Sequence, residues 1–74
     1  PTKTMYRVIV GSFDTKQQAQ DVIRNIKADG FPVFMYQTGG KYRLQIGAFQ
    51  SKNSATNLMK KAMEYGYNAF ISIK

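Results

Sequence analysis

The residues best suited to bind a ligand are arginines and lysines that alternate with apolar side chains in two matching segments. Residues 6–13 read YRVIVGSF and residues 42–49 read YRLQIGAF, so that Arg7 and Arg43 hold the same place in each. Alternation with a period of two is typical of a β-strand, whose successive side chains point to opposite faces. One face of the two predicted strands collects cationic, amide and aliphatic side chains: Arg7, Ile9, Lys41, Arg43 and Gln45. Such a face can hold an anion by charge and by bidentate hydrogen bonding.

Catalytic chemistry has little support in the composition. The 74 residues include no histidine and no cysteine, which removes the commonest metal ligand, the usual general base and the reactive thiol. The four carboxylates are spread along the chain, at Asp14, Asp21, Asp29 and Glu64. No two of them are spaced to share a proton or to flank a scissile bond. We therefore expect a binding protein rather than an enzyme, with no metal and no cofactor.

The net charge favours an anionic partner. Eleven Lys and Arg residues against four Asp and Glu residues give +7. A basic balance of this kind is typical of proteins that bind nucleic acid, anionic lipid or acidic glycan, although a solvated basic face gives the same composition. No segment approaches the roughly 20 apolar residues that a bilayer-spanning helix needs, and no signal peptide is visible.

The two segments belong to a longer internal repeat. Tyr6 recurs 36 positions later as Tyr42, and the register continues without a gap to the last residue. The matched pairs beyond the octets include Lys16 and Lys52, Ala19 and Ala55, Gly30 and Gly66, Phe31 and Tyr67, and Phe34 and Phe70. A period of this size indicates that one supersecondary unit has been duplicated.

The chain length predicts one small domain, near the lower limit of what a single apolar core can stabilise. Because the sequence begins with Pro1 and a polar PTKT segment, we expect residues 1–4 to be a linker remnant from a longer protein. Residues 5–74 then form the domain, with one repeat over residues 5–38 and the other over residues 41–74.

Each repeat has the pattern of a strand, a helix and a second strand. Thr15 and Ser51 are at capping positions before apolar residues at helical spacing, and Gly30 and Gly66 end the two helices as left-handed caps. Two β-α-β units predict an α+β fold of the ferredoxin-like, split βαβ type (βαββαβ), a four-stranded antiparallel sheet with both helices on one face. We expect the duplicated strands to be neighbours in the centre of the sheet, with their tyrosines in the core.

The sheet face without helices is where we expect a ligand. Ser12 stands at the end of the first strand, and the edge strands add Met35 and Ile71 to this face if Phe34 and Phe70 point into the core. An isolated sheet arginine is usually only solvated, but here two arginines share the face with an amide and bare aliphatic side chains. The candidate binding residues are Arg7, Ile9, Ser12, Met35, Lys41, Arg43, Gln45 and Ile71.

Over residues 5–74 the sequence resembles the SPOR (sporulation-related repeat) family. The resemblance is carried by the octets YRVIVGSF and YRLQIGAF, each followed by a helix with a small residue six positions on and a Gly-aromatic pair at its end. It is greatest to the tandem-repeat modules at the C-terminus of cell-wall amidases. The resemblance implies a ferredoxin-like fold and non-catalytic binding of peptidoglycan glycan strands that lack stem peptides.

The same resemblance implies the partners and the location of the protein. The expected partners are the peptide-free (denuded) glycan and a covalently linked hydrolase of the N-acetylmuramoyl-L-alanine amidase type, which the domain targets to septal or sporulation wall. No nucleic acid and no membrane are expected as partners. The expected location is the cell wall of a bacterium, either outside the cell or on the mother-cell side. The chain could equally come from a phage lysin that acts on the wall.

Position by position, the match to the family pattern is incomplete. Ser12, Arg43 and Ile71 keep the pattern, whereas Ile9 stands where the family usually has glutamine and Lys41 replaces an aromatic residue of some members. Gln45 in the second repeat mirrors the glutamine that the first repeat lacks. The register of the ligand across the sheet therefore stays open.

The implied ligand has a charge that suits the predicted face. Each muramic acid freed of its peptide exposes a lactyl carboxylate, with which arginine and lysine can pair. Serine and amide side chains can bond hydroxyl and N-acetyl groups, and aliphatic side chains can cover the sugar C–H faces.

Two alternatives remain open at this point. A single-stranded RNA-binding domain shares the duplicated β-α-β order and a basic sheet, but such modules stack bases on aromatic residues of the two central strands. The corresponding positions here are Arg7, Ile9, Arg43 and Gln45. A regulatory small-molecule module that dimerises through its sheet is suggested only by the uncovered aliphatic residues.

Overall fold

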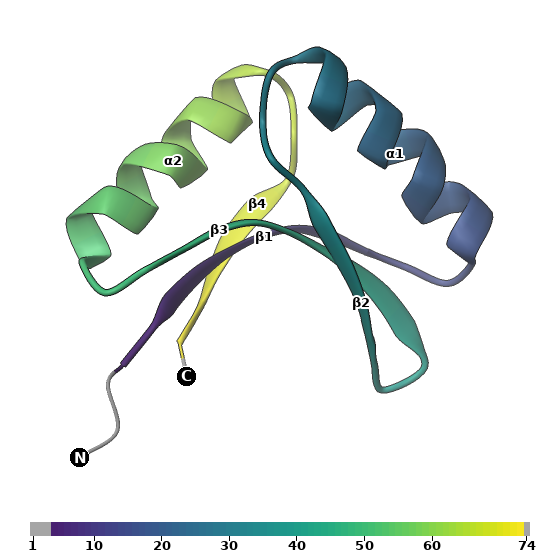
Figure 1. Ribbon diagram of the computed structural model, residues 1–74, viewed down its shortest axis with the longest axis horizontal. Helices are drawn as coiled ribbons and strands as arrows, with labels where there is room; N and C mark the ends of the chain where they lie inside the picture. The colour runs from purple at the N-terminus through teal and green to yellow at the C-terminus, as the bar shows by residue number, and fades with distance from the viewer. Residues whose placement is uncertain (1–3, 74) are drawn as a thin grey trace.

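The computed structural model describes residues 4–73, in which two β-α-β units follow one another. The elements are β1 (Tyr6–Phe13), α1 (Lys16–Ala28), β2 (Phe34–Thr38), β3 (Lys41–Phe49), α2 (Lys52–Glu64) and β4 (Ala69–Ile73). The strands form one antiparallel sheet in the order β2-β3-β1-β4, and both helices lie on the same side of it (Figure 1). The predicted α+β split βαβ fold is confirmed, with the duplicated strands β1 and β3 adjacent in the centre. Of the expected linker remnant, residues 1–3 lie outside the described residues.

The two helices begin and end in the same way. Before each helix, the side-chain oxygen of Thr15 or Ser51 accepts a hydrogen bond from the backbone N–H three positions on, at 3.2 and 3.4 Å. After each helix, Gly30 and Gly66 adopt φ of 90° and 92°, which glycine enters without the steric cost of a Cβ. The helix boundaries predicted from the repeat therefore hold in both units.

The core lies between the helices and the sheet face that they cover. Its fully buried side chains come from the two central strands and from both helices: Val8, Val10, Leu44, Ile46, Ala19, Ile26, Ala55 and Ala62, with Phe31 beside them. Tyr6 and Tyr42 pack against this cluster, as expected from the alternation in their strands. Burial of each large aliphatic side chain contributes about 1.5–3 kcal/mol, so the helix-covered face holds the fold together.

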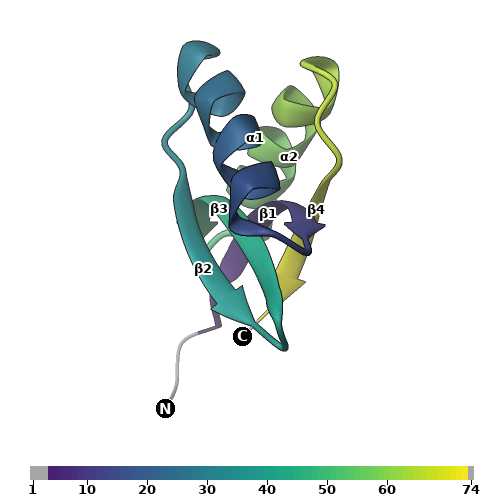
Figure 2. The ribbon, with the colours of Figure 1, turned by 90° about the vertical axis from the view of Figure 1, so that its right-hand side faces the viewer.

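The sheet is bent into an arch, with the helices on its convex side (Figures 1 and 2). Two irregularities interrupt the β1–β3 ladder, one between Val8 and Ile9 and the other between Val10 and Ser12. Irregularities of this kind bend a strand and increase its twist. Gly11, at the second of them, has φ of 70°. The face without helices is concave as a result.

We expect Gly11→Ala to destabilise the domain by about 1–2 kcal/mol, because an L-residue with a side chain is strained at left-handed φ. A Cβ at Gly11 would also lie 2.9 Å from Phe13 Cζ. Chemical denaturation measures the loss. Gly39→Ala isolates the contact with Phe13, because Gly39 shares the left-handed φ, at 57°, but has nothing within 4 Å of an added Cβ. We expect Gly39→Ala to lose less stability than Gly11→Ala. An unchanged denaturation midpoint for Gly11→Ala would contradict the role of this residue in the bend.

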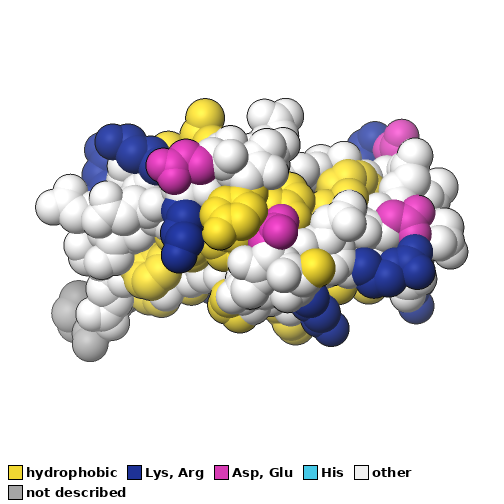
Figure 3. All heavy atoms as spheres, turned by 90° about the horizontal axis from the view of Figure 1, so that it is seen from above, with side chains coloured by type: hydrophobic (Ala, Val, Ile, Leu, Met, Phe, Trp, Pro, Cys, Tyr) yellow, Lys and Arg dark blue, Asp and Glu magenta, His cyan; other side chains and the backbone are white. Residues whose placement is uncertain are grey.

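The C-terminal ends of the two helices meet at a small aromatic cluster. The Phe31 ring packs edge-on against Tyr65 and Tyr67, with ring centroids 5.3 and 6.4 Å away. Burial, together with a hydrogen bond to Asp29 and the charge of that carboxylate, raises the pKa of Tyr67 to about 12. Seen from the helix side, hydrophobic side chains run along the middle of the molecule, with both positive and negative side chains around them (Figure 3). The helix side is therefore mixed in charge.

Candidate functional site

The concave face of the sheet carries side chains from all four strands. In the β1 pairings, Ile9 lies between Gln45 of β3 and Phe70 of β4, and residues paired directly across antiparallel strands share a face. The same register pairs Arg7 with Ser72, Ser12 with Arg43, Tyr36 with Arg43, and Phe34 with Gln45. We define the open face as Arg7, Ile9, Ser12, Phe34, Tyr36, Arg43, Gln45, Phe70 and Ser72.

Two arginines set the electrostatics of the open face. Arg7 Nη1 donates a hydrogen bond of 3.1 Å to Gln45 Oε1, and the Arg43 guanidinium lies 6.0 Å from the centroid of the Phe70 ring. The Nε atoms of both arginines are buried and have no hydrogen-bond partner within residues 4–73. Leaving a buried donor unsatisfied costs about 1–3 kcal/mol. A ligand reaches the partly exposed ends of these side chains rather than the buried Nε atoms. The two guanidinium charges favour a ligand that brings hydrogen-bond acceptors to those ends, best of all an anion.

No carboxylate within residues 4–73 forms an ion pair with either of these arginines. The two ion pairs within residues 4–73 join Arg24 to Asp21 on α1, and Lys41 to Asp14. Lys41 is exposed at the start of β3, and its pairing with Asp14 partly compensates its charge. Of the three cationic residues predicted for the site, Arg7 and Arg43 remain without a carboxylate partner in this part of the chain.

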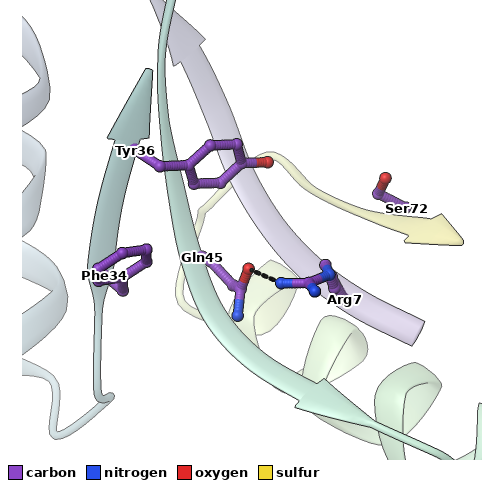
Figure 4. A pocket seen from close by; sticks show the side chains of 5 residues that line it. All are labelled: Arg7, Phe34, Tyr36, Gln45 and Ser72. Carbon is purple, nitrogen blue, oxygen red and sulfur yellow. Dashed lines mark hydrogen bonds between the residues drawn. The ribbon is translucent and has the colours of Figure 1, made fainter. Parts of the chain in front are cut away.

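A pocket of about 260 Å³ opens beside Arg7, lined by Arg7, Phe34, Tyr36, Gln45 and Ser72. Phe34 and Tyr36 project from β2 on one side, Ser72 projects from β4 on the other, and the Arg7–Gln45 hydrogen bond lies between them (Figure 4). The lining thus combines a cation, an amide, hydroxyl groups and aromatic rings. Such a combination suits a ligand with an acid group, polar substituents and apolar ring faces.

Two predicted site residues lie on the opposite side of the sheet. Met35 and Ile71 pack against the core cluster under the helices, whereas Phe34 and Phe70 are 64% and 40% exposed. The prediction that Met35 and Ile71 belong to the open face is therefore wrong. Apolar residues occupy both faces of β2 and β4, so the alternation alone does not say which set faces the helices. The pairing of Phe34 with Gln45 and of Phe70 with Ile9 shows that these two phenylalanines lie on the open face.

Ile9 lies on the open face as the alternation predicts, but its role differs from the expected one. It is 0% exposed and does not belong to the core cluster under the helices. Because neighbouring strands cover it, Ile9 forms the floor of the open face and offers no free surface to a ligand. Ser12, in contrast, is exposed at the end of β1 opposite Arg43.

Four residues of the open face were missed by the sequence analysis: Phe34, Tyr36, Phe70 and Ser72. One signal for them was present, because Phe34 and Phe70 are the same position of the two repeats. The expectation for Met35 and Ile71 depends on Phe34 and Phe70 pointing into the core, and the structure shows that this condition does not hold. An aromatic residue at the same position of both repeats is also consistent with a binding face, and this interpretation agrees with the exposure of Phe34 and Phe70 in the structure.

Residues 4–73 contain no group of acidic side chains that could hold a metal ion. No helix among them is long and apolar enough to cross a membrane.

Comparisons with known proteins agree with this geometry. The family model described as SPOR domain matches residues 2–73. The chain is also similar to the solution structure of the peptidoglycan binding domain of the B. subtilis cell wall lytic enzyme CwlC, with 32% sequence identity and a TM-score of 0.87, over 100% of this chain and 94% of that chain. The comparison with curated proteins gave no match. On the family match over nearly its whole length, this chain belongs to the SPOR domain family.

Proposed function

We propose that this domain binds the glycan strands of peptidoglycan and does not cleave them. Its family and its similarity to the peptidoglycan binding domain of CwlC support this function. The proposal rests on one structural observation above all, the two half-buried arginines of the open face, which have no carboxylate partner within residues 4–73. An acidic glycan supplies carboxylates that the terminal nitrogens of their guanidinium groups can bond.

Within peptidoglycan, we propose that the preferred strands are those without stem peptides. Loss of the peptide leaves a free lactyl carboxylate on each muramic acid, whereas an intact stem ties that group into a neutral amide. Arg7 and Arg43 bind this carboxylate by charge-assisted hydrogen bonds, for which a guanidinium has the matching fork geometry. Gln45 and Ser72 bond N-acetyl and hydroxyl groups, and the aromatic ring of Phe34 covers a sugar C–H face.

The remaining predicted residues have smaller roles in this proposal. Ser12 contacts the ligand at the Arg43 end of the face, and Lys41 adds positive charge there while it pairs with Asp14. Ile9 supports the face from below. Met35 and Ile71 are excluded because they lie under the helices.

We further propose that the domain directs an attached cell-wall hydrolase of the amidase type to septal or sporulation wall. The origin of the similar domain, in a cell wall lytic enzyme, supports this role. In this proposal residues 1–4 are the remnant of the linker to the enzyme, residues 5–74 are the binding domain with its repeats over 5–38 and 41–74, and the protein works at the cell wall.

Retention on purified sacculi tests the proposal. We expect the domain to sediment with sacculi whose stem peptides an amidase has removed, and to sediment severalfold less with untreated sacculi. Retention should fall as salt is raised, because half-exposed charge pairs are screened. Equal retention on both kinds of sacculi would contradict the preference for peptide-free strands, and no retention on either would contradict peptidoglycan binding.

The RNA alternative has gained one supporting observation, since Phe34 and Phe70 are exposed on the open face and bases can stack on aromatic rings. These rings lie on the edge strands rather than on the central strands that RNA-binding modules use. A gel-shift assay with mixed single-stranded RNA at physiological salt decides between the two ligands. We expect no shifted band, and a shifted band would favour RNA.

A further inference from the structure

The internal repeat gives the open face an approximate two-fold symmetry. Exchange of β1 with β3 and of β2 with β4 reproduces the strand order β2-β3-β1-β4 in reverse, as a two-fold axis between β1 and β3 requires. The two β-α-β units face each other across this axis (Figure 1). Residues 36 positions apart are then equivalent, and the equivalent pairs on the open face are Arg7 and Arg43, Ile9 and Gln45, Phe34 and Phe70, and Tyr36 and Ser72.

The axis divides the open face into two half-sites. We define the Arg7 half-site as Arg7, Phe34, Gln45 and Ser72, and the Arg43 half-site as Arg43, Phe70, Ile9 and Tyr36. The two share an arginine, an aromatic ring from an edge strand, and a buried Nε without a partner in residues 4–73. The symmetry therefore places the two arginines at equivalent positions of the open face.

The side chains beside the two arginines differ in polarity. In the Arg7 half-site, Arg7 Nη1 bonds Gln45 Oε1 at 3.1 Å, and Ser72 lines the same pocket. In the Arg43 half-site, the buried Ile9 takes the place of the amide, and the guanidinium of Arg43 lies 6.0 Å over the Phe70 ring. Hydroxyl groups lie on both sides, at Ser72 beside Arg7 and at Ser12 and Tyr36 beside Arg43. The amide of Gln45 is therefore the polar group that the Arg7 half-site has and the Arg43 half-site lacks.

We infer that Gln45 and Ile9 determine the direction in which a glycan strand lies on this domain. The inference rests on the proposed function and goes beyond it. A fully symmetric face would hold a directional polymer equally well in two directions related by the axis. With Gln45 in one half-site and the buried Ile9 in the other, an acetamido group next to one carboxylate meets an amide partner in one direction and no amide partner in the other.

The same geometry sets the smallest ligand. Because both half-sites contain an arginine without a carboxylate partner in residues 4–73, a fragment with two acid groups in succession occupies both, and a fragment with one acid group occupies only one. One lost hydrogen bond to a partly buried polar group is enough for about a tenfold preference in direction.

A spin-labelled ligand tests the inference on the 74-residue chain. The probe is a peptide-free tetrasaccharide of alternating N-acetylglucosamine and N-acetylmuramic acid, with a nitroxide at its reducing end. Backbone amide signals of the ¹⁵N-labelled protein report which half of the face lies near the label. We expect strong broadening of one member of each of the equivalent pairs Phe34 and Phe70, and Tyr36 and Ser72, with about a tenfold ratio between the two directions.

Two variants connect the direction to the named residues. Gln45→Leu removes the amide that distinguishes the Arg7 half-site, so we expect the ratio between equivalent signals to fall toward one. Gln37→Leu makes the same chemical change on β2 at an exposed position outside the open face, and we expect it to keep the ratio of the original chain.

The outcomes separate this inference from the function on which it rests. Equal broadening of both members of each pair, or an unchanged ratio in Gln45→Leu, would overturn the inference while leaving glycan binding intact. No broadening and no chemical-shift change with the tetrasaccharide would overturn glycan binding itself, and the inference with it.

Discussion

Replacement of both Arg7 and Arg43 by glutamine is expected to remove most of the retention on peptide-free sacculi while the fold stays intact. Each arginine is half-buried and contributes about 1 kcal/mol to binding a carboxylate, between the values typical of exposed pairs and of charged hydrogen bonds. Together they account for about 2 kcal/mol, or roughly a thirtyfold loss of affinity. Glutamine keeps much of the side-chain length and removes the charge.

The stability of this variant distinguishes binding from folding. The Nε atoms of the two arginines have no partner within residues 4–73, so their removal relieves a cost that offsets the loss of the Arg7–Gln45 hydrogen bond and of the Arg43–Phe70 contact. We therefore expect a melting temperature equal to that of the original chain or slightly higher. If the double variant unfolded at a much lower temperature, the two arginines would be structural.

Charge alone must be controlled for in this experiment. The variant Arg24→Gln/Lys27→Gln lowers the net charge by the same amount but changes exposed side chains of α1, on the side of the sheet opposite the open face. We expect it to keep its retention at physiological salt. Equal losses in the two double variants would mean that net charge, and not the open face, drives retention.

Leu44→Ala is expected to affect stability rather than specificity. Leu44 is 0% exposed in the core between β3 and the helices, and truncation of a buried leucine costs about 2–5 kcal/mol. A domain of this size has about 4–11 kcal/mol of stability in total. The variant should therefore melt at a far lower temperature, and it should lose binding only in proportion to the fraction that is unfolded.

Two controls accompany Leu44→Ala: addition of the ligand, and a substitution at an exposed position. A ligand that binds only the folded state stabilises it by mass action, so a saturating peptide-free glycan should raise the melting temperature of Leu44→Ala. Met63→Ala on α2, where Met63 is 54% exposed, should change stability by no more than about 0.5 kcal/mol. A Leu44→Ala protein as stable as the original chain would contradict the assignment of the core.

The sequence predicts the central part of this structure well for a physical reason. In β1 and β3, charged and amide side chains mark one face and large aliphatic side chains mark the other, so the alternation fixes which face meets the helices. The helix limits are equally clear, because Thr15 and Ser51 cap them and Gly30 and Gly66 end them. Duplication strengthens both predictions, since each signal occurs twice.

The edge strands were harder to predict. The segments FMYQT and AFISI have apolar residues on both faces, and a change of phase by one residue exchanges the two faces completely. Only their pairing with β3 and β1 shows that Phe34 and Phe70 are exposed and that Met35 and Ile71 are packed. The aromatic part of the candidate site was lost from the sequence-based prediction for this reason.

Contacts between distant segments account for the other differences. The ion pair of Lys41 with Asp14 joins residues 27 positions apart, and the local sequence pattern of neither segment predicts it. Burial of Ile9 likewise depends on side chains from neighbouring strands. The sequence places these residues on the correct elements, but their surroundings follow from the tertiary structure.

The Nε–H signals of Arg7 and Arg43 in nuclear magnetic resonance test the proposed binding face most directly. On titration with a peptide-free glycan oligomer, we expect both signals to move and to become protected from exchange with water, together with shifts of the backbone signals of the open face. If both arginine signals stayed unchanged while shifts gathered at the helix-side residues Met63 and Tyr65, the open face would not be the glycan-binding surface.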